Sequence, residues 1–247
     1  MSRAARRGAL VRGYVLGSKP WRDTSRILEV FSRDHGRLGV FARGVRGPAS
    51  KLSSLLQPFR PLLLSLSGSG EAQWLSSCEP EGYVPELPPA ALMSGFYLNE
   101  LLIKLTARDD PHPELFDAYA EGLDGLRTGV SPHRPLRLFE KRLLQEVGYG
   151  LELEVDAAGR PVDHQGYYRF RPGAGLLRVV AGDAGALPGS ALLALAAESL
   201  DGEQELLCAR RLLAAALDHC LEGRPITTRA VALACRPAAG RIAKEET

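Results

Sequence analysis

The sequence predicts an α+β protein in which a small five-stranded β-barrel precedes a mainly α-helical region. Three observations carry this prediction. Short apolar segments with a period of two, separated by turn residues, occupy residues 8–79; four prolines lie within residues 80–89; and apolar residues recur at helical spacing beyond them. We therefore expect the barrel in residues 1–80 and the helical region in residues 81–247.

The barrel strands are expected at residues 9–16, 27–32, 37–42, 59–66 and 71–78, with tight turns at residues 33–36 and 68–70. The third strand has the clearest alternation. One of its faces is aliphatic, and the other carries Arg37, Gly39, Phe41 and Arg43. This second face is not a core face. Residues 43–51 are basic and rich in Gly and Pro, so we expect an exposed, mobile loop without regular structure.

Helices are expected beyond the proline cluster. Apolar spacing predicts one at residues 92–106, one at residues 136–147 that ends at Gly148, and one at residues 204–221 that ends before Gly223. The pair Thr227 and Thr228 indicates a fresh helix start. Residues 150–183 break this pattern and predict an irregular insert or a small hairpin.

The charge distribution is strongly asymmetric. The net charge is +2, but the first sixty residues carry thirteen Lys and Arg against three Asp and Glu, and the remaining 187 residues carry eighteen against twenty-six. A segment of +10 followed by one of −8 favours an anionic partner for the first segment, because self-repulsion is costly without one. The alternative interpretation is a basic surface that only interacts with solvent.

Other protein classes are disfavoured. The apolar run at residues 191–197 is far shorter than the ~20 residues that cross a bilayer, and the basic N-terminal stretch is not followed by an apolar signal segment. The four cysteines are widely spaced without a C-x-x-C pair, which suggests neither a disulfide framework nor a zinc ribbon. We expect a cytoplasmic protein without a membrane partner.

The basic half contains the strongest candidate site. Cations that track phosphates and aromatic rings that stack on bases are typical of surfaces that bind single-stranded nucleic acid. The candidates on two predicted strands and the basic loop are Arg22, Arg26, Arg37, Phe41, Arg43, Arg46 and Lys51, with Trp21 among them.

Catalytic and metal motifs are weak. The five histidines lack ligand spacing, and no phosphate-cradling glycine motif is present. Asp109 and Asp110 could begin a nuclease metal site, but the following Pro-His-Pro favours an interhelical turn. We therefore assign no catalytic residue, metal ligand or cofactor.

The helical region also has a candidate site. Arg137 and Lys141 are separated by one helical turn beside an apolar stripe, so they could form the rim of a groove for an acidic peptide with an aromatic end. The alternative is an ordinary helix surface with ion pairs between neighbours.

An ordered series of segments gives a more specific indication. In the first half these are residues 15–25 (VLGSKPWRDTS), 30–32 (VFS), 35–37 (HGR), 43–46 (RGVR), 50–52 (SKL) and 55–59 (LLQPF). In the second half they are residues 97–102 (YLNELL), 114–116 (ELF), 138–140 (LFE), 148–150 (GYG), 223–225 (GRP) and 228–229 (TR). Together they resemble the bacterial recombination mediator family RecO, over about residues 12–233.

The resemblance implies an N-terminal OB-fold barrel, a helical C-terminal domain and a non-enzymatic role in recombinational repair. Members of the family bind single- and double-stranded DNA, anneal complementary strands, and work with RecR and often RecF to load RecA onto strands covered by single-strand binding protein (SSB). The insert has no cysteine, so the chain resembles the branch without zinc. The family's site for the acidic SSB tail would correspond to Arg137, Lys141 and Arg142. The alternatives are a protein adaptor with incidental DNA binding and a small metal-dependent nuclease.

Overall fold

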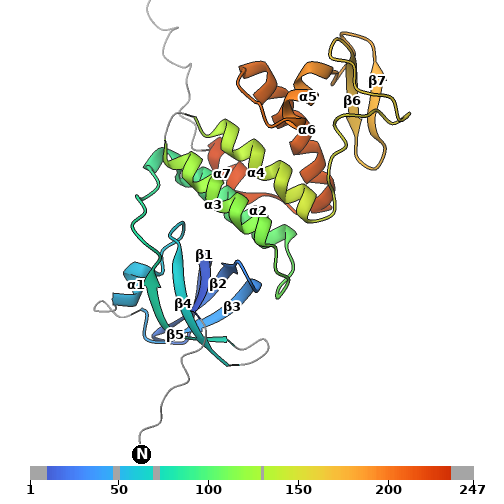
Figure 1. Ribbon diagram of the computed structural model, residues 1–247. Coiled ribbons are helices and arrows are strands. Elements are labelled where there is room, and N and C mark those ends of the chain that lie inside the picture. Colours follow the sequence, from blue (N-terminus) through green and yellow to red (C-terminus); the bar gives the residue numbers. More distant parts are fainter. Residues whose placement is uncertain (1–9, 47–50, 69–72, 129–130, 235–247) are drawn as a thin grey trace, which may run out of the picture.

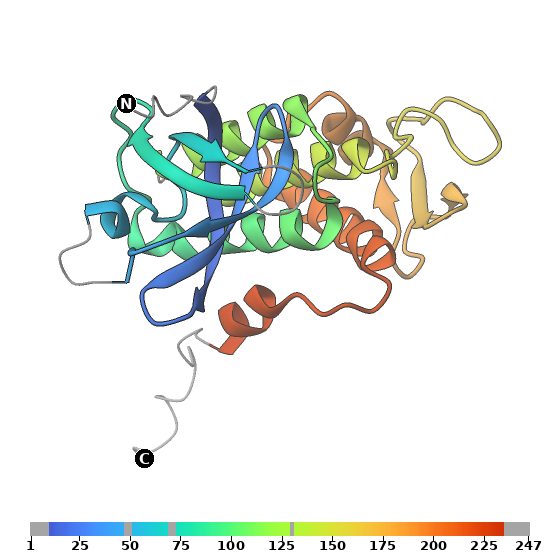
Figure 2. The ribbon, with the colours of Figure 1, turned by 90° about the horizontal axis from the view of Figure 1, so that it is seen from below.

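The computed structural model describes residues 10–46, 51–68, 73–128 and 131–234 of the chain. Figure 1 shows two layers: a β-barrel formed by the first part of the chain, and a group of helices with a small sheet at its far end. Seen from the barrel side in Figure 2, the strands cross in front of the helices. The predicted order of a barrel followed by helices is confirmed.

Five strands form the closed barrel, in the order β1-β2-β3-β5-β4. They are β1 (Leu10–Trp21), β2 (Ser25–Ser32), β3 (Gly36–Ala42), β4 (Leu62–Ser67) and β5 (Gln73–Pro80). All neighbours are antiparallel except β3 and β5, which pair in parallel at Val40 with Gln73 and Phe41 with Trp74. This order is that of the OB-fold, a five-stranded Greek-key barrel.

The strand pattern of the sequence positions the barrel core. Leu28 and Val30 of β2 and Leu38, Val40 and Ala42 of β3 are buried at alternate positions, because successive side chains of a strand point to opposite faces. The core is aliphatic and includes Val15, Leu28, Val30, Val40, Leu62 and Leu64, all at most 1% exposed.

Several strand bounds differ from their predictions; β2 begins at Ser25 instead of residue 27, and β5 ends at Pro80 instead of residue 78. The largest differences are in β1 and β4. β1 was expected to end at residue 16 but continues to Trp21, because the register with β2 shifts between Val15 and Gly17 and pairing then resumes. β4 was expected from residue 59 but begins at Leu62. The predicted starts of the first and fifth strands, at residues 9 and 71, lie outside the described residues.

The basic segment after β3 differs in part from its prediction. Arg43, Gly44 and Arg46 are exposed, but Val45 is 1% exposed and belongs to the barrel core, so the segment is anchored at this point. Residues 47–50 lie outside the description. Lys51 begins the short helix α1 (Lys51–Leu55) instead of ending an irregular loop.

The helical region contains six α-helices in the described residues. They are α2 (Leu92–Leu105), α3 (Pro113–Arg127), α4 (His133–Glu146), α5 (Gly189–Ala196), α6 (Glu203–Leu221) and α7 (Thr227–Ala234), with a 3₁₀ turn at Pro89–Ala91. The helices expected at residues 92–106, 136–147 and 204–221 and the start at Thr227 are confirmed; α3 and α5 were not anticipated. No helix among the described residues is long and apolar enough to span a membrane.

The insert predicted at residues 150–183 contains a hairpin of β6 (Tyr167–Arg171) and β7 (Gly175–Val179). The short strand β8 (Leu187–Pro188), just after the predicted insert, pairs with β6 and completes a three-stranded sheet. Before it, the Asp156 carboxylate accepts hydrogen bonds from the backbone N–H groups of Ala158 and Arg160 and from the Arg160 guanidinium. The hydrogen bond from the Arg160 guanidinium, and after it those from the backbone, lower the pKa of Asp156 and hold the turn at residues 156–160.

A second, larger hydrophobic core joins the outside of the barrel to the helices. Tyr14, Leu16 and Phe31 point out of the barrel and pack among the buried residues of α2, α3 and α4. Asn99 of α2 donates a hydrogen bond to the backbone oxygen of Leu16 at 2.8 Å and accepts one from the Tyr119 hydroxyl at 2.6 Å. The buried asparagine therefore links strand β1 to two helices.

Candidate nucleic-acid interface

Three aromatic rings meet on the outer surface of the barrel and form what we call the aromatic platform: Trp21, Phe41 and Trp74. The rings of Phe41 and Trp74 are stacked, with centroids 4.8 Å apart, and Trp21 meets them edge-on at 5.0 Å and 6.0 Å. All three side chains are half-buried, so each retains exposed surface. Half-exposed rings on a strand face provide a surface on which nucleic-acid bases can stack.

Strand register explains why rings distant in the sequence meet. Phe41 alternates with the buried Val40 and Ala42, so it points out of the barrel, and it pairs with Trp74 across the parallel β3–β5 contact. Trp21 lies at the end of β1, where the strand enters the turn to β2. The face of β2 and β3 and the loop between β1 and β2 are also where OB-folds bind oligonucleotides.

Two arginines lie over the platform. The guanidinium carbon of Arg22 is 4.2 Å from the ring centroid of Trp21, and that of Arg43 is 4.0 Å from the ring centroid of Trp74. Both arginines are exposed. Cation–π contacts of this kind hold a positive charge beside a ring face.

Arg46 joins this group through the backbone. The Arg46 guanidinium donates a hydrogen bond to the backbone oxygen of Arg22 at 3.0 Å, and the backbone N–H of Arg46 donates to the backbone oxygen of Thr24 at 3.1 Å. The segment after β3 is therefore attached to the β1–β2 turn, where Arg22 has a left-handed φ of 51°. Arg22, Arg43 and Arg46 thus border the platform from two loops.

Two of the predicted residues are placed elsewhere, and the structure does not describe the side chain of a third. Arg37 faces the helices: it donates to Glu29 at 2.5 Å and to the backbone oxygen of Thr106 at 2.9 Å, and its side chain is only 13% exposed. Arg26 pairs with the inward-facing Ala42, so it lies on the other side of β2 from the platform, near the Ser18 hydroxyl. The side chain of Lys51 lies outside the described residues.

Sequence reasoning missed two residues of the same surface. Trp74 occupies a strand that was predicted, but its pairing with β3 is long-range and has no local signal. Lys19 pairs with Ile27, which pairs with Phe41, so register places this exposed lysine on the same outward face. Lys19 was missed because the first strand was predicted to end at residue 16 rather than at Trp21.

The helical candidates divide into two groups, and Arg137 forms the first. It is buried and donates to Glu140 at 2.6 Å, while the same carboxylate oxygen accepts from the Tyr97 hydroxyl at 2.7 Å. Burial raises the pKa of Glu140, and the adjacent guanidinium opposes this effect. Arg137 is therefore part of an internal network and not of an exposed rim, contrary to its sequence interpretation.

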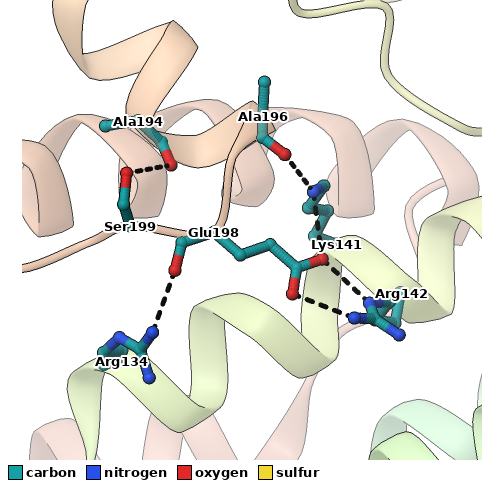
Figure 3. A network of polar contacts seen from close by, with 7 residues as sticks. All are labelled: Arg134, Lys141, Arg142, Ala194, Ala196, Glu198 and Ser199. Atoms are coloured by element: carbon teal, nitrogen blue, oxygen red, sulfur yellow. Dashed lines mark hydrogen bonds and ion pairs between the residues drawn. The ribbon is translucent and has the colours of Figure 1, made fainter.

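Lys141 and Arg142 form the second group, around Glu198 at the end of α5 (Figure 3). Arg142 donates from Nε and Nη2 to the two carboxylate oxygens of Glu198, both at 2.9 Å, and Lys141 Nζ donates to Oε1 at 3.1 Å. Arg134 donates to the backbone oxygen of Glu198 at 2.9 Å. We call these four residues the Glu198 clamp.

The clamp makes the stability of the protein depend on pH in a defined direction. Hydrogen bonds from Arg142 and Lys141 lower the pKa of Glu198 from 4.5 to about 2. A lowered folded-state pKa stabilises the fold above the unfolded pKa, and this contribution is lost as the pH falls. The difference in Tm between the wild type and Glu198→Gln should be constant above pH 5 and decrease from pH 4.5 towards pH 2. A difference that stays constant to pH 3 would contradict this assignment.

The two carboxylates considered for a nuclease lie in the turn between α2 and α3. Asp109 is exposed with a left-handed φ of 55°, and Asp110 contacts His112 at 3.3 Å. The turn predicted for this pair is therefore present. Within the described residues, no group of three or more His, Cys, Asp or Glu side chains could hold a metal ion.

Comparison with known proteins decides the family. The model described as Recombination protein O N terminal matches residues 9–83, and the model described as Recombination protein O C terminal matches residues 89–230. The chain belongs to the RecO family. Its barrel corresponds to the first of these models and its helical region to the second.

Relatives in the RecO family are similar over most of their length. The DNA repair protein RecO of Azoarcus sp. is 45% identical over 224 residues, which cover 88% of this chain and 92% of the relative. The DNA repair protein RecO of Aromatoleum aromaticum is 44% identical, with the same coverage. That of Alkalilimnicola ehrlichii is 45% identical, covering 88% of each chain. RecO family membership supports a role in DNA repair and recombination.

Proposed function

We propose that this protein is a non-enzymatic recombination mediator that binds DNA through the aromatic platform and its arginines. The observation that carries the proposal is the meeting of Trp21, Phe41 and Trp74 with exposed Arg22 and Arg43 on the face where OB-folds bind oligonucleotides. The rings would stack on unpaired bases, and Arg46 and Lys19 would add phosphate contacts. Arg37 and Arg26 are not part of this proposed interface.

The same surface supports strand annealing. Guanidinium groups that neutralise phosphates lower the repulsion between two strands, so that complementary bases can meet. Single- and double-stranded DNA are the proposed ligands. We further propose that the protein acts with RecR, and with RecF where that protein is needed, to load RecA onto strands covered by SSB. The decisive functional assay is annealing of complementary strands coated with SSB; failure to accelerate it would contradict the mediator role.

The helical region is the proposed docking site for the acidic tail of SSB. Lys141 and Arg142 lie at the surface of α4 and already hold a carboxylate, that of Glu198. Arg137 is excluded from direct contact because it is buried with Glu140. The proposed docking of the SSB tail therefore rests on Lys141 and Arg142 and not on Arg137.

Neutralising a platform arginine should change the salt dependence of DNA binding. Each phosphate contact contributes about 0.7 to the slope of log K against log salt concentration for single strands. Arg43→Gln and Arg46→Gln should each lower the slope by about 0.7 in fluorescence anisotropy titrations with a labelled oligonucleotide. Arg211→Gln, at an exposed position of α6, is the matched control and should leave the slope unchanged. Equal slopes for all four proteins would remove the loop from the interface.

A metal-dependent nuclease is the competing function, and a direct assay separates it. Labelled DNA incubated with the protein and Mg²⁺ or Mn²⁺ should remain intact under the mediator proposal. Cleavage that is lost in Asp109→Asn and Asp110→Asn would favour the nuclease.

A further inference from the structure

Three cationic side chains of one helix contact Glu198 in the Glu198 clamp: Lys141 and Arg142 bind its carboxylate, and Arg134 binds its backbone oxygen (Figure 3). Arg134, Lys141 and Arg142 belong to α4 and share one face of it, because positions seven and eight apart lie two turns along the same side. Lys141 also donates to the backbone oxygen of Ala196 at 2.8 Å. These contacts join α4 to the last residue of α5 and to the segment that follows it.

The geometry around the Glu198 carboxylate is that of a carboxylate-binding site. Arg142 approaches with two parallel N–H groups, and Lys141 adds a third charge-assisted hydrogen bond. Such bidentate pairs are among the strongest and most specific contacts that a carboxylate makes. The Glu198 side chain is still 28% exposed and that of Arg142 is 43% exposed, so solvent reaches the pair.

The Glu198 side chain can leave this site without unwinding the helix end. Glu198 has a left-handed φ of 59°, at the position after a helix where glycine is most common. The helix end is held by the backbone, since Ser199 N–H donates to Ala194 at 2.9 Å and Glu198 N–H donates to Leu195 at 3.3 Å. The side chain contributes to neither bond.

We propose that Glu198 is an internal occupant of a docking site for the carboxylate of an acidic peptide, and that binding exchanges one carboxylate for the other. The inference rests on the proposed docking function of the helical region and adds its regulation. A terminal carboxylate would take the place of the Glu198 carboxylate on Lys141 and Arg142. Half-buried Leu138, one turn after Arg134, would contact the apolar side chain of the terminal residue.

Charge balance favours an exchange over simple addition. While Glu198 is bound, Lys141 and Arg142 are already paired, so a second carboxylate would meet a site with little remaining positive charge. The apparent affinity for a peptide is therefore reduced by the fraction of molecules in which the clamp is open. If about one molecule in ten is open, removing the glutamate strengthens binding about tenfold.

The test measures binding of a fluorescein-labelled, aspartate-rich nonapeptide that ends in phenylalanine with a free carboxylate. Glu198→Gln should bind it about tenfold more tightly than the wild type. Glu154→Gln removes the same charge at an exposed position outside the site and should bind as the wild type does. The C-terminally amidated peptide should gain much less from Glu198→Gln.

A second variant protects the test against loss of folding. Glu198→Gly also empties the site, and glycine suits the left-handed backbone at this position. It should bind the peptide as tightly as Glu198→Gln does. Adding Lys141→Gln and Arg142→Gln to either variant should reverse the gain.

The outcomes separate the inference from the function on which it rests. Tighter binding by both Glu198 variants supports the exchange. Measurable binding that is equal in the wild type and both variants overturns the exchange while leaving the docking site in place. Absence of binding by all proteins, with unchanged affinity for single-stranded DNA, overturns the exchange and the proposed docking function together and leaves the DNA interface unaffected.

Discussion

Replacing Asn99 with alanine should lower the free energy of unfolding by about 3 kcal/mol. Asn99 is the only asparagine of the chain, and its side chain is buried between β1, α2 and α3. The substitution leaves the backbone oxygen of Leu16 and the hydroxyl of Tyr119 without their present partner. Each unpaired buried polar group costs about 1–3 kcal/mol, and the lost volume adds a cavity.

Urea denaturation followed by circular dichroism measures this effect. Gln145→Ala, at an exposed position of α4, is the control and should change the free energy of unfolding by less than about 0.5 kcal/mol. Tyr119→Phe removes one of the two hydrogen bonds and should give an intermediate loss. If Asn99→Ala were as stable as the control, the asparagine would not be the link between barrel and helices.

The second large effect concerns single-stranded DNA. Stacking of a base on an aromatic ring contributes about 1–3 kcal/mol, so removing both tryptophan rings of the platform should weaken binding about 100-fold. The variant is Trp21→Ala combined with Trp74→Ala, and the measurement is anisotropy of a labelled oligo-dT at fixed salt. Phe41 would remain, but it would lose the ring on which it stacks.

Two controls identify the cause of that loss. Tyr83→Ala removes an aromatic side chain that is 92% exposed and does not belong to the platform, and it should leave the affinity unchanged. Trp74→Phe retains a ring that can stack and should retain most of the affinity. A double alanine variant that binds as the wild type does would exclude base stacking on these rings.

Local patterns predicted the barrel where period-two alternation was strong. β3 was located almost to the residue, because its aliphatic and polar faces alternate without interruption. β1 was cut short, because Gly17 lies where the register shifts and the alternation changes phase. Such a shift depends on pairing with β2, which the segment itself does not encode.

There are physical reasons why α3 and α5 were not predicted. α3 begins with Pro113, which suits the first turn, but Gly122 and Gly125 interrupt its apolar pattern. Gly122 packs against α2, where an added Cβ would lie 3.4 Å from Leu98. α5 consists almost entirely of small and apolar residues, so it has no polar face from which a helical period could be recognised.

The sequence predicted some residues of the candidate site but not others, and two arginines of the same strand face show why. Arg37 and Arg43 share the outward side of the β3 segment, but the turn after α2 and Glu29 cover the first, while the second extends beyond the strand to Trp74. Arg137 is likewise covered by tertiary contacts, because it pairs with Glu140 one turn away and the Tyr97 hydroxyl of α2 donates to the same carboxylate. The alternation of a strand or helix predicts on which face a side chain lies. Whether that face is exposed depends on tertiary contacts, which the local pattern does not contain.

Tryptophan fluorescence tests the central claim most directly, because the chain has two tryptophans and both belong to the aromatic platform. The protein is titrated with unlabelled oligo-dT while its intrinsic emission is recorded, and the affinity is measured in parallel by anisotropy. Stacking on Trp21 and Trp74 predicts saturable quenching with the same Kd in both measurements. Full binding in the anisotropy experiment without any change in tryptophan emission would contradict a DNA interface at the platform.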